Sequence, residues 1–203
     1  GLQAGKSRPS DLPPGTRALL MVEADGAAAD LPRQIAALQQ ALDGNGLLEI
    51  RSGFEREAIV QLWAARKSLS HAVKQIAPLK INEDVVVPVS QLADFVDYID
   101  HTAHTHRLAV VSFGHAGNGN LHVNLMVHPD DADEMDRAHL ALDAILMRAL
   151  ALGGTLSGEH GIGTEKRRFV DREIDPATLD LMRAIKQQFD PHGLLNPGKL
   201  FPD

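Results

Sequence analysis

Two histidines in the middle of the chain carry the clearest chemical signal. They are His115 and His122, in the segment 112–124, which has apolar strand-like runs on both sides. Asn118-Gly119 favours a type I′ turn, because both central residues of that turn need a positive φ. With these two residues at the tip of a hairpin, His115 lies directly opposite His122. Opposed residues share a face, with Cβ atoms roughly 4.5–5.5 Å apart, so the spacing predicts two imidazoles that can bind one divalent metal ion.

A glycine-rich segment further along supplies the third candidate ligand. Residues 153–163 contain five glycines, which disfavour a helix or strand interior and suit a backbone that turns sharply. Glu159 and His160 lie between those glycines. Two histidines and one glutamate leave an open coordination position, the pattern of a catalytic zinc site. Surface histidines and a loop charge are the favoured interpretation of either motif alone, whereas the two motifs together favour a metal site.

Three segments resemble a known family. They are residues 114–124 (GHAGNGNLHVN), 157–163 (SGEHGIG) and 195–201 (LNPGKLF). They resemble the C-terminal half of the FAD-linked 2-hydroxyacid dehydrogenases, which include D-lactate dehydrogenases, the glycolate oxidase flavin subunit and D-2-hydroxyglutarate dehydrogenase. The resemblance covers roughly residues 17–202. It implies that the chain is a piece of a longer protein, whose N-terminal domain is absent here and holds most of the FAD.

The resemblance also implies roles for the four residues of the two motifs. His115, His122 and Glu159 are expected to bind zinc or a similar ion, and His160 is expected to be the catalytic base. A metal ion lowers the pKa of a hydroxyl group that it binds. An imidazole, with a reference pKa of about 6.5, suits proton abstraction near neutral pH.

Four further residues are implied to contact substrate or flavin. Asn124 is expected to contact the substrate, with a hydrogen bond to neighbouring backbone as an equal alternative. Arg66, in a Trp-x-x-Arg motif, is expected to bind the substrate carboxylate through two parallel hydrogen bonds, against the alternative of a solvated helix charge. Lys80 is a substrate candidate that departs from the family pattern, since it precedes Asp84 by four residues rather than two. Asn196 is the candidate flavin contact, with a chain-end turn as the alternative.

Apolar periodicity and end signals predict an α+β domain. The expected architecture is an antiparallel sheet with helices mainly on one face, and the family resemblance implies a ferredoxin-like plait. Ser90 is the predicted N-cap of the third helix, and Asp131 and Asp175 cap the last two. Strands are predicted over residues 17–23, 47–51, 80–88, 108–115 and 120–128. Helices are predicted over about residues 31–42, 55–76, 90–106, 131–152 and 175–189.

Composition excludes several classes of protein. The 203 residues suffice for one domain with a sizeable core. A net charge of −7 argues against a general binder of nucleic acid or anionic membranes. Because cysteine is absent, the chain itself cannot build a disulfide, a thiolate zinc site or an iron–sulfur cluster.

Residues 1–15 are expected to be a linker or tail, and residues 16–203 the FAD-linked oxidase C-terminal domain. No apolar run approaches the roughly 18–20 residues that cross a bilayer, and no signal-peptide pattern opens the chain. A cytoplasmic protein is therefore expected, with membrane association through an electron-acceptor partner left open. The expected partners are a small 2-hydroxy acid and the protein's own N-terminal FAD domain. The sequence does not identify the electron acceptor, and it allows a homodimer.

These expectations combine into one function and one alternative. The chain is expected to be the substrate- and metal-binding domain of an FAD-dependent enzyme that oxidises a D-2-hydroxy acid to a 2-oxo acid by hydride transfer to flavin. The isolated domain is expected to be inactive. The alternative is a non-catalytic packing or dimerisation domain without a metal site, in which His115, His122 and Glu159 do not converge.

Overall fold

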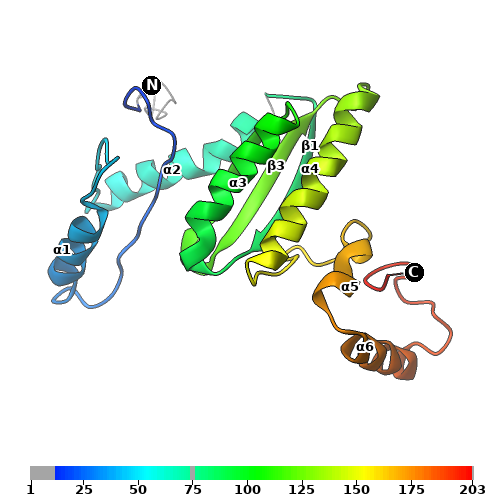
Figure 1. Cartoon of the computed structure of the whole chain (residues 1–203). Helices are drawn as coiled ribbons and strands as arrows, with labels where there is room; N and C mark the ends of the chain where they lie inside the picture. The colour runs from blue at the N-terminus through cyan, green and yellow to red at the C-terminus, as the bar shows by residue number, and fades with distance from the viewer. Residues whose placement is uncertain (1–11, 74–75, 203) are drawn as a thin grey trace, which may run out of the picture. The chain divides into compact units, whose positions relative to one another are not determined.

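The computed structural model describes residues 12–73 and 76–202. The chain forms two compact units, residues 1–71 and 72–203, which are described separately. Figure 1 labels the helices and the strands β1 and β3. The helices are α1 (Leu31–Leu42), α2 (Arg56–Val73), α3 (Leu92–Thr105), α4 (Ala132–Ala151), α5 (Val170–Glu173) and α6 (Pro176–Phe189). The strands are β1 (Leu79–Val86), β2 (Ala109–His115) and β3 (Asn120–Val127).

The regular secondary structure in the described part of the first unit consists of helices. The predicted helices are confirmed as α1, which has a proline in its first turn, and α2. The strands predicted over residues 17–23 and 47–51 are wrong, because neither segment belongs to any strand among the described residues. Their apolar side chains stay exposed, with Leu20 at 58% and Leu48 at 55%. An apolar run alone does not make a strand, which needs a hydrogen-bonded partner and a buried face.

The second unit is built on a three-stranded antiparallel sheet. Its strand order is β1-β3-β2, so the central strand β3 pairs with both neighbours. Helices α3 and α4 lie side by side over one face of this sheet (Figure 1). The predicted α+β architecture, with helices on one face of an antiparallel sheet, is therefore confirmed.

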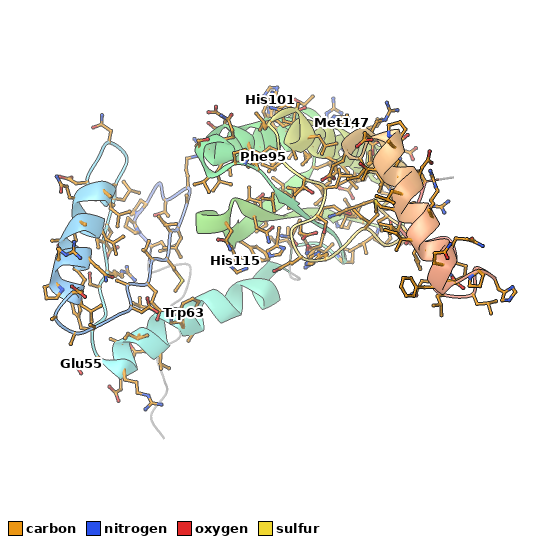
Figure 2. All side chains as sticks on the ribbon, turned by 90° about the horizontal axis from the view of Figure 1, so that it is seen from below. Glu55, Trp63, Phe95, His101, His115 and Met147 are labelled. Carbon is orange, nitrogen blue, oxygen red and sulfur yellow. The ribbon has the colours of Figure 1, made fainter. Side chains whose placement is uncertain are left out.

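Side chains alternate along β3 and divide it between two environments. The helix-facing side forms the core with α3 and α4, and every member of that core is well buried. His122 and Asn124 alternate with core residues and so point to the opposite face. Figure 2 shows Phe95 on the helix side of the sheet and His115 on the other side. The core includes Val85, Phe95, Ile99, Val123, Leu125, Val127, Ile145, Leu146 and Ala149.

The end of α4 leads to the edge of β1 instead of a fourth full strand. The order β1-α3-β2-β3-α4 is compatible with a ferredoxin-like plait, which stays a prediction. The segment after α4 makes one antiparallel bridge with the end of β1, in which Thr155 pairs with Val86. Gly154 permits this approach, since a Cβ there would lie 2.1 Å from the Val86 carbonyl oxygen. The segment beyond the bridge then carries Glu159.

Two of the three predicted helix caps are confirmed. The carboxylates of Asp131 and Asp175 accept hydrogen bonds from backbone N–H groups in the first turns of α4 and α6. Ser90 is not a cap, because it lies inside a 3-10 turn, Val89–Gln91, that precedes α3. Gln91 occupies the N-cap position without a side-chain hydrogen bond.

Candidate metal centre

The β2–β3 hairpin places both histidines on one face, in a register that differs from the predicted one. His115 pairs with Asn120 rather than with His122, because the tip is a 3-10 turn, Ala116–Asn118, followed by Gly119. The predicted two-residue type I′ turn is therefore wrong. The register differs by two residues, and since side chains alternate with a period of two, the faces are unchanged. The imidazoles lie diagonally, with ring centroids 6.0 Å apart.

Gly119 explains the longer turn. Its φ of 70° lies in the left-handed region that favours glycine. Its carbonyl accepts a hydrogen bond from the Val87 N–H at 3.0 Å, and a Cβ on Gly119 would lie 1.9 Å from the Val87 carbonyl oxygen. The hairpin tip is thus docked against the end of β1. Because this contact involves a distant segment of the chain, the hairpin sequence alone does not predict the turn.

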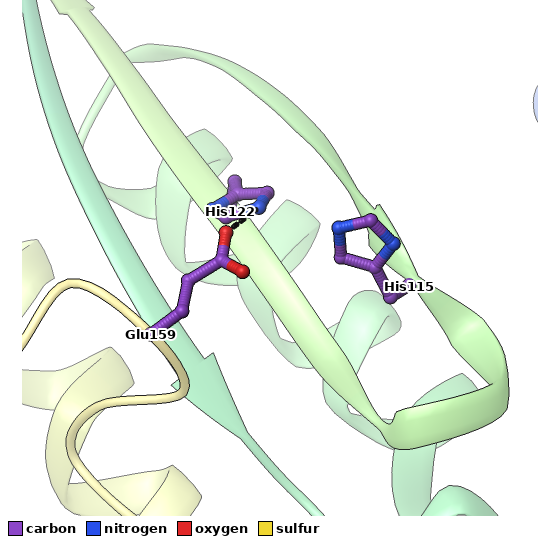
Figure 3. A group of neighbouring side chains, drawn as sticks. All are labelled: His115, His122 and Glu159. Carbon is purple, nitrogen blue, oxygen red and sulfur yellow. Dashed lines mark ion pairs between the residues drawn. The ribbon is translucent and has the colours of Figure 1, made fainter.

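Glu159 reaches the two histidines from the loop after α4. Figure 3 shows the three side chains directed toward one another. The ligand atoms of His115, His122 and Glu159 all lie within 4.8 Å of one another, and His122 Nε2 is 3.1 Å from Glu159 Oε1. Ligands of one zinc ion, each at about 2.0–2.2 Å from it, lie within about 4.4 Å of one another. Small side-chain rotations therefore suffice to close the set around an ion.

His122 is the buried member of the set. It is 7% exposed, whereas His115 and Glu159 are exposed. Burial lowers the pKa of His122 and outweighs the Glu159 carboxylate, which raises it. The neutral imidazole is the form that binds metal ions, so the environment of His122 favours the binding form.

His160 lies beside this set without belonging to it. Its ring stacks on that of His122, with centroids 5.2 Å apart and an interplanar angle of 24°. Its Nδ1 lies 3.5 Å from Oδ1 of Asp84, and its side chain is 44% exposed. The imidazole is therefore adjacent to the candidate metal position and open to solvent.

A buried carboxylate holds the loop that carries Glu159 and His160. Asp84 on β1 is fully buried, and its Oδ2 accepts hydrogen bonds from the N–H groups of Gly158 (2.8 Å), Glu159 and His160 (3.0 Å). Three consecutive N–H groups around one oxygen form an anion-binding concavity. Burial alone would raise the pKa of Asp84, but hydrogen bonds from Lys166 and from this backbone outweigh burial and hold it well below its ordinary value.

Lys166 neutralises Asp84 from within the protein. It is 3% exposed, and its Nζ donates to Oδ1 of Asp84 at 2.8 Å and to the Asp84 and Leu156 carbonyls, each at 2.7 Å. Its Nζ also lies 3.1 Å from Oε2 of Glu83. Burial raises the pKa of Glu83, against the opposing effect of Lys166. Asp84 and Lys166 thus form a fully buried ion pair behind the loop.

Sequence reasoning missed this ion pair as part of the site. One signal was present, since Glu83 and Asp84 interrupt a strand otherwise rich in valine, and buried charges require partners. Nothing in the sequence pointed to Lys166, which stands among the charged residues that follow the glycine-rich segment.

Asn124 lies on the same face as His122 and is fully buried. Its Nδ2 donates to the carbonyls of Val111 at 2.8 Å and His122 at 3.1 Å, which is the backbone-bonded alternative considered above. These donations fix the orientation of the amide, and its Oδ1 has no hydrogen-bond partner. Asn82, its register partner on β1, also has a buried Oδ1 without a partner. Two buried acceptors on the paired strands β1 and β3 therefore lack a donor among the described residues.

The remaining predicted residues lie outside this cluster or outside the described side chains. Lys80 pairs with Met126, four residues before Asp84 and so about 13 Å away along β1. Asn196 is exposed in the C-terminal segment, with a φ of 48°. Arg66 lies within α2 as predicted, but its side chain lies outside the described part of the structure. Their predicted roles stay predictions.

The helices give no sign of a membrane span. Among the described residues, none is both long enough and apolar enough to cross a bilayer.

Comparison with known proteins defines the class of the chain. Residues 2–200 match the family described as FAD linked oxidases, C-terminal domain. The chain therefore belongs to this family, as its motifs indicated.

Individual relatives are similar over most of the chain. Glycolate oxidase subunit GlcD of Bacillus subtilis is 34% identical over 94% of the chain and 40% of its own length. A probable mitochondrial D-lactate dehydrogenase of Danio rerio is 31% identical over 89% of the chain and 37% of its own length. D-2-hydroxyglutarate dehydrogenase of Stutzerimonas stutzeri is 30% identical over 82% of the chain and 36% of its own length. The chain thus spans about 40% or less of these relatives.

Proposed function

We propose that this chain, over residues 16–203, is the substrate- and metal-binding domain of an FAD-dependent enzyme that oxidises a D-2-hydroxy acid to the 2-oxo acid. The convergence of His115, His122 and Glu159 carries the proposal. The similar relatives are named for glycolate, D-lactate and D-2-hydroxyglutarate, which are all 2-hydroxy acids. The hydride acceptor is FAD, held mainly by an N-terminal domain outside this chain, and Asn196 contributes a flavin contact.

The donor set fits a divalent metal ion, with zinc as the first choice. Two imidazole nitrogens and one carboxylate oxygen are the ligands of many catalytic zinc sites. His115 and Glu159 are exposed, which leaves an open side for a substrate. When bound, the ion supplies Lewis acidity that lowers the pKa of a substrate hydroxyl group.

His160 is proposed as the general base that takes the hydroxyl proton on its imidazole. Its ring stacks on the ligand His122, so a hydroxyl group at the metal position lies within its reach. Its solvent exposure allows the proton to leave for water or a second group. Proton removal by a positioned imidazole contributes about 10²–10⁴-fold to rate in comparable enzymes.

Polar groups on the same sheet face are proposed to hold the substrate. Asn124 stays the proposed substrate contact: its Oδ1 and that of Asn82 are buried acceptors without a partner, which a substrate hydroxyl group would satisfy once the substrate displaces what covers this face. Arg66 of α2, in the first compact unit, is proposed from its Trp-x-x-Arg motif alone, and not from any placement beside this face, to bind the carboxylate as a planar fork. Lys80 is a further candidate cation for a substrate that extends along β1.

Calorimetric titration of the 203-residue chain with zinc tests the metal site. We expect one site with an affinity that falls at least 100-fold in His122→Ala. Glu159→Gln, at an exposed position, should fall similarly without affecting the core. His101→Ala is the matched control, because His101 lies exposed on the outer side of α3 (Figure 2) and should change the affinity less than twofold. Equal zinc binding by the unmodified chain and all three variants would contradict a metal site at these residues.

A further inference from the structure

We propose that Asp84, neutralised by Lys166, is a positioning residue that holds the Glu159–His160 loop in its metal-binding geometry before any metal binds. This inference rests on the proposed metal site and goes beyond it, since Asp84 is not itself a ligand. It assigns a function to a buried ion pair that otherwise needs explanation, because such pairs are weak contributors to stability.

The first argument is the hydrogen bonding of the loop. Gly158, Glu159 and His160 all direct their N–H groups at one oxygen of Asp84. Ser157 adds a side-chain hydrogen bond to the other oxygen at 3.3 Å, and its own Oγ accepts from the Gly161 N–H at 2.8 Å. Glycine-rich backbone is conformationally free, so these bonds supply the order that the local sequence lacks.

The second argument is the place of Asp84 in the sheet. Asp84 is the register partner of His122 across β1 and β3. The same strand pair therefore fixes both the buried histidine ligand and the carboxylate that holds the loop. Because Asp84 binds the backbone N–H of Glu159, the β1–β3 register sets how closely Glu159 approaches His122.

The third argument is the chemistry of the pair. A carboxylate oxygen accepts several N–H donors at once, but a buried carboxylate without a counter-charge is strongly unfavourable. Lys166 provides that charge and uses its remaining donors on the Asp84 and Leu156 carbonyls. The pair thus holds both the loop backbone before Glu159 and the backbone of β1.

A second carboxylate, Glu173, holds the same loop at a different point and can be compared with Asp84. Glu173 on α5 accepts hydrogen bonds from the Thr155 hydroxyl and from the Leu156 N–H at 3.0 Å. It holds the start of the loop and contacts neither Glu159 nor His160 in the hydrogen bonds of the described residues. A variant at Glu173 therefore loosens the loop without removing the contacts that position the ligand.

The test is the zinc affinity of Asp84→Asn. Asparagine has the same size, but its NH₂ group must face either the three N–H donors or the Lys166 ammonium, so donor meets donor in both orientations. We expect the dissociation constant for zinc to rise about 10–100-fold, as for other residues that orient metal ligands. Glu173→Gln should raise it less than threefold. Ser157→Ala, a milder loss at the other oxygen of the same carboxylate, should raise it about threefold.

Amide hydrogen exchange of the unmodified chain without added metal provides a second readout. The N–H groups of Gly158, Glu159 and His160 should be protected well above the solvent-exposed N–H groups of the loop. Protection that appears only with zinc would overturn the proposal, whether or not Asp84→Asn folds. Zinc affinity in Asp84→Asn equal to the unmodified value would also overturn it. Those results leave the metal site intact if His122→Ala still loses zinc, whereas failure of the unmodified chain to bind zinc contradicts the site itself.

Discussion

The hairpin and the Glu159 loop bring candidate metal ligands to one point by different physical means. The hairpin places His115 and His122 through strand pairing, in which alternation alone decides the face. The loop, residues 153–163, has no regular pairing beyond its first bridge and is held by side chains from distant segments. The ligands on strands are therefore set by short-range geometry, and the loop ligand by long-range contacts.

This difference has a consequence for how each region tolerates change. A strand ligand keeps its direction while the sheet stays folded, so changes near it act through the stability of the whole sheet. A loop ligand can lose its direction while the protein stays folded, since its order depends on a few hydrogen bonds. Changes to residues around the hairpin ligands should therefore mainly lower stability, whereas changes to residues around the loop ligand should mainly lower metal affinity.

Gly119→Ala should produce the largest loss of stability. A left-handed φ costs a residue with a Cβ about 1–2 kcal/mol, and the Cβ would meet the Val87 carbonyl oxygen at 1.9 Å. We expect a loss of about 3 kcal/mol in the free energy of unfolding, measured by urea denaturation. Gly117→Ala is the matched control in the same turn, with open space around its Cβ, and should change stability by less than about 0.5 kcal/mol. Similar values for the two variants would contradict the docked turn.

Gly158→Ala should mainly lower metal affinity. A Cβ at this position would lie 2.7 Å from the buried Asn120 side chain, so either that side chain or the loop must shift, and we expect the loop to move away from β3. We expect the zinc dissociation constant to rise about tenfold, as for other changes around a metal ligand, with little change in the urea midpoint. The double variant Gly158→Ala/Asn120→Ala relieves the contact and should recover most of the affinity. A double variant as weak as the single one would show that this contact is not the cause.

The pH dependence of stability should separate the loop from the hairpin. Because the pKa of Asp84 is held below its ordinary value in the folded state, its contribution is complete above the unfolded pKa of about 3.9. That contribution is lost as the pH falls below about 4, towards the lowered folded pKa. Urea unfolding between pH 6 and pH 2.5 should show a shallower decline in Asp84→Asn than in the unmodified chain. Parallel declines would mean that Asp84 is not preferentially ionised in the folded state.

Lys80→Met should have the smallest effect. Lys80 lies four residues before Asp84 on β1, too far to contact a metal ion bound by His115, His122 and Glu159. The zinc dissociation constant should stay within twofold of the unmodified value, measured by the same calorimetric titration. A larger change would indicate that the site extends along β1 beyond Asn82.

Much of the sheet could be predicted from sequence, because its signals are local. Alternation placed His115 and His122 on one face even though the turn type was wrong, since the true register differs by an even number of residues. The turn itself was not predictable, because it depends on contact between Gly119 and Val87, which directly follows the distant strand β1. The false strands over residues 17–23 and 47–51 show the same limit, since an apolar run does not reveal whether a partner strand exists.

The candidate site could be predicted only in part. The motifs pointed to the three candidate ligands and the neighbouring His160, and the structure brings these four side chains together. The residues that hold the loop were missed, because Asp84 and Lys166 are 82 positions apart and have no shared pattern. Sequence patterns show which groups can do chemistry, whereas the contacts that orient those groups depend on tertiary structure.

Anomalous diffraction from crystals of the chain grown with zinc tests the central claim most directly. We predict one dominant peak at about 2.0–2.2 Å from an imidazole nitrogen of His115, an imidazole nitrogen of His122 and a carboxylate oxygen of Glu159. A dominant peak at other side chains, such as the exposed His101 and His104 on α3, with no density among these three residues, would contradict the account.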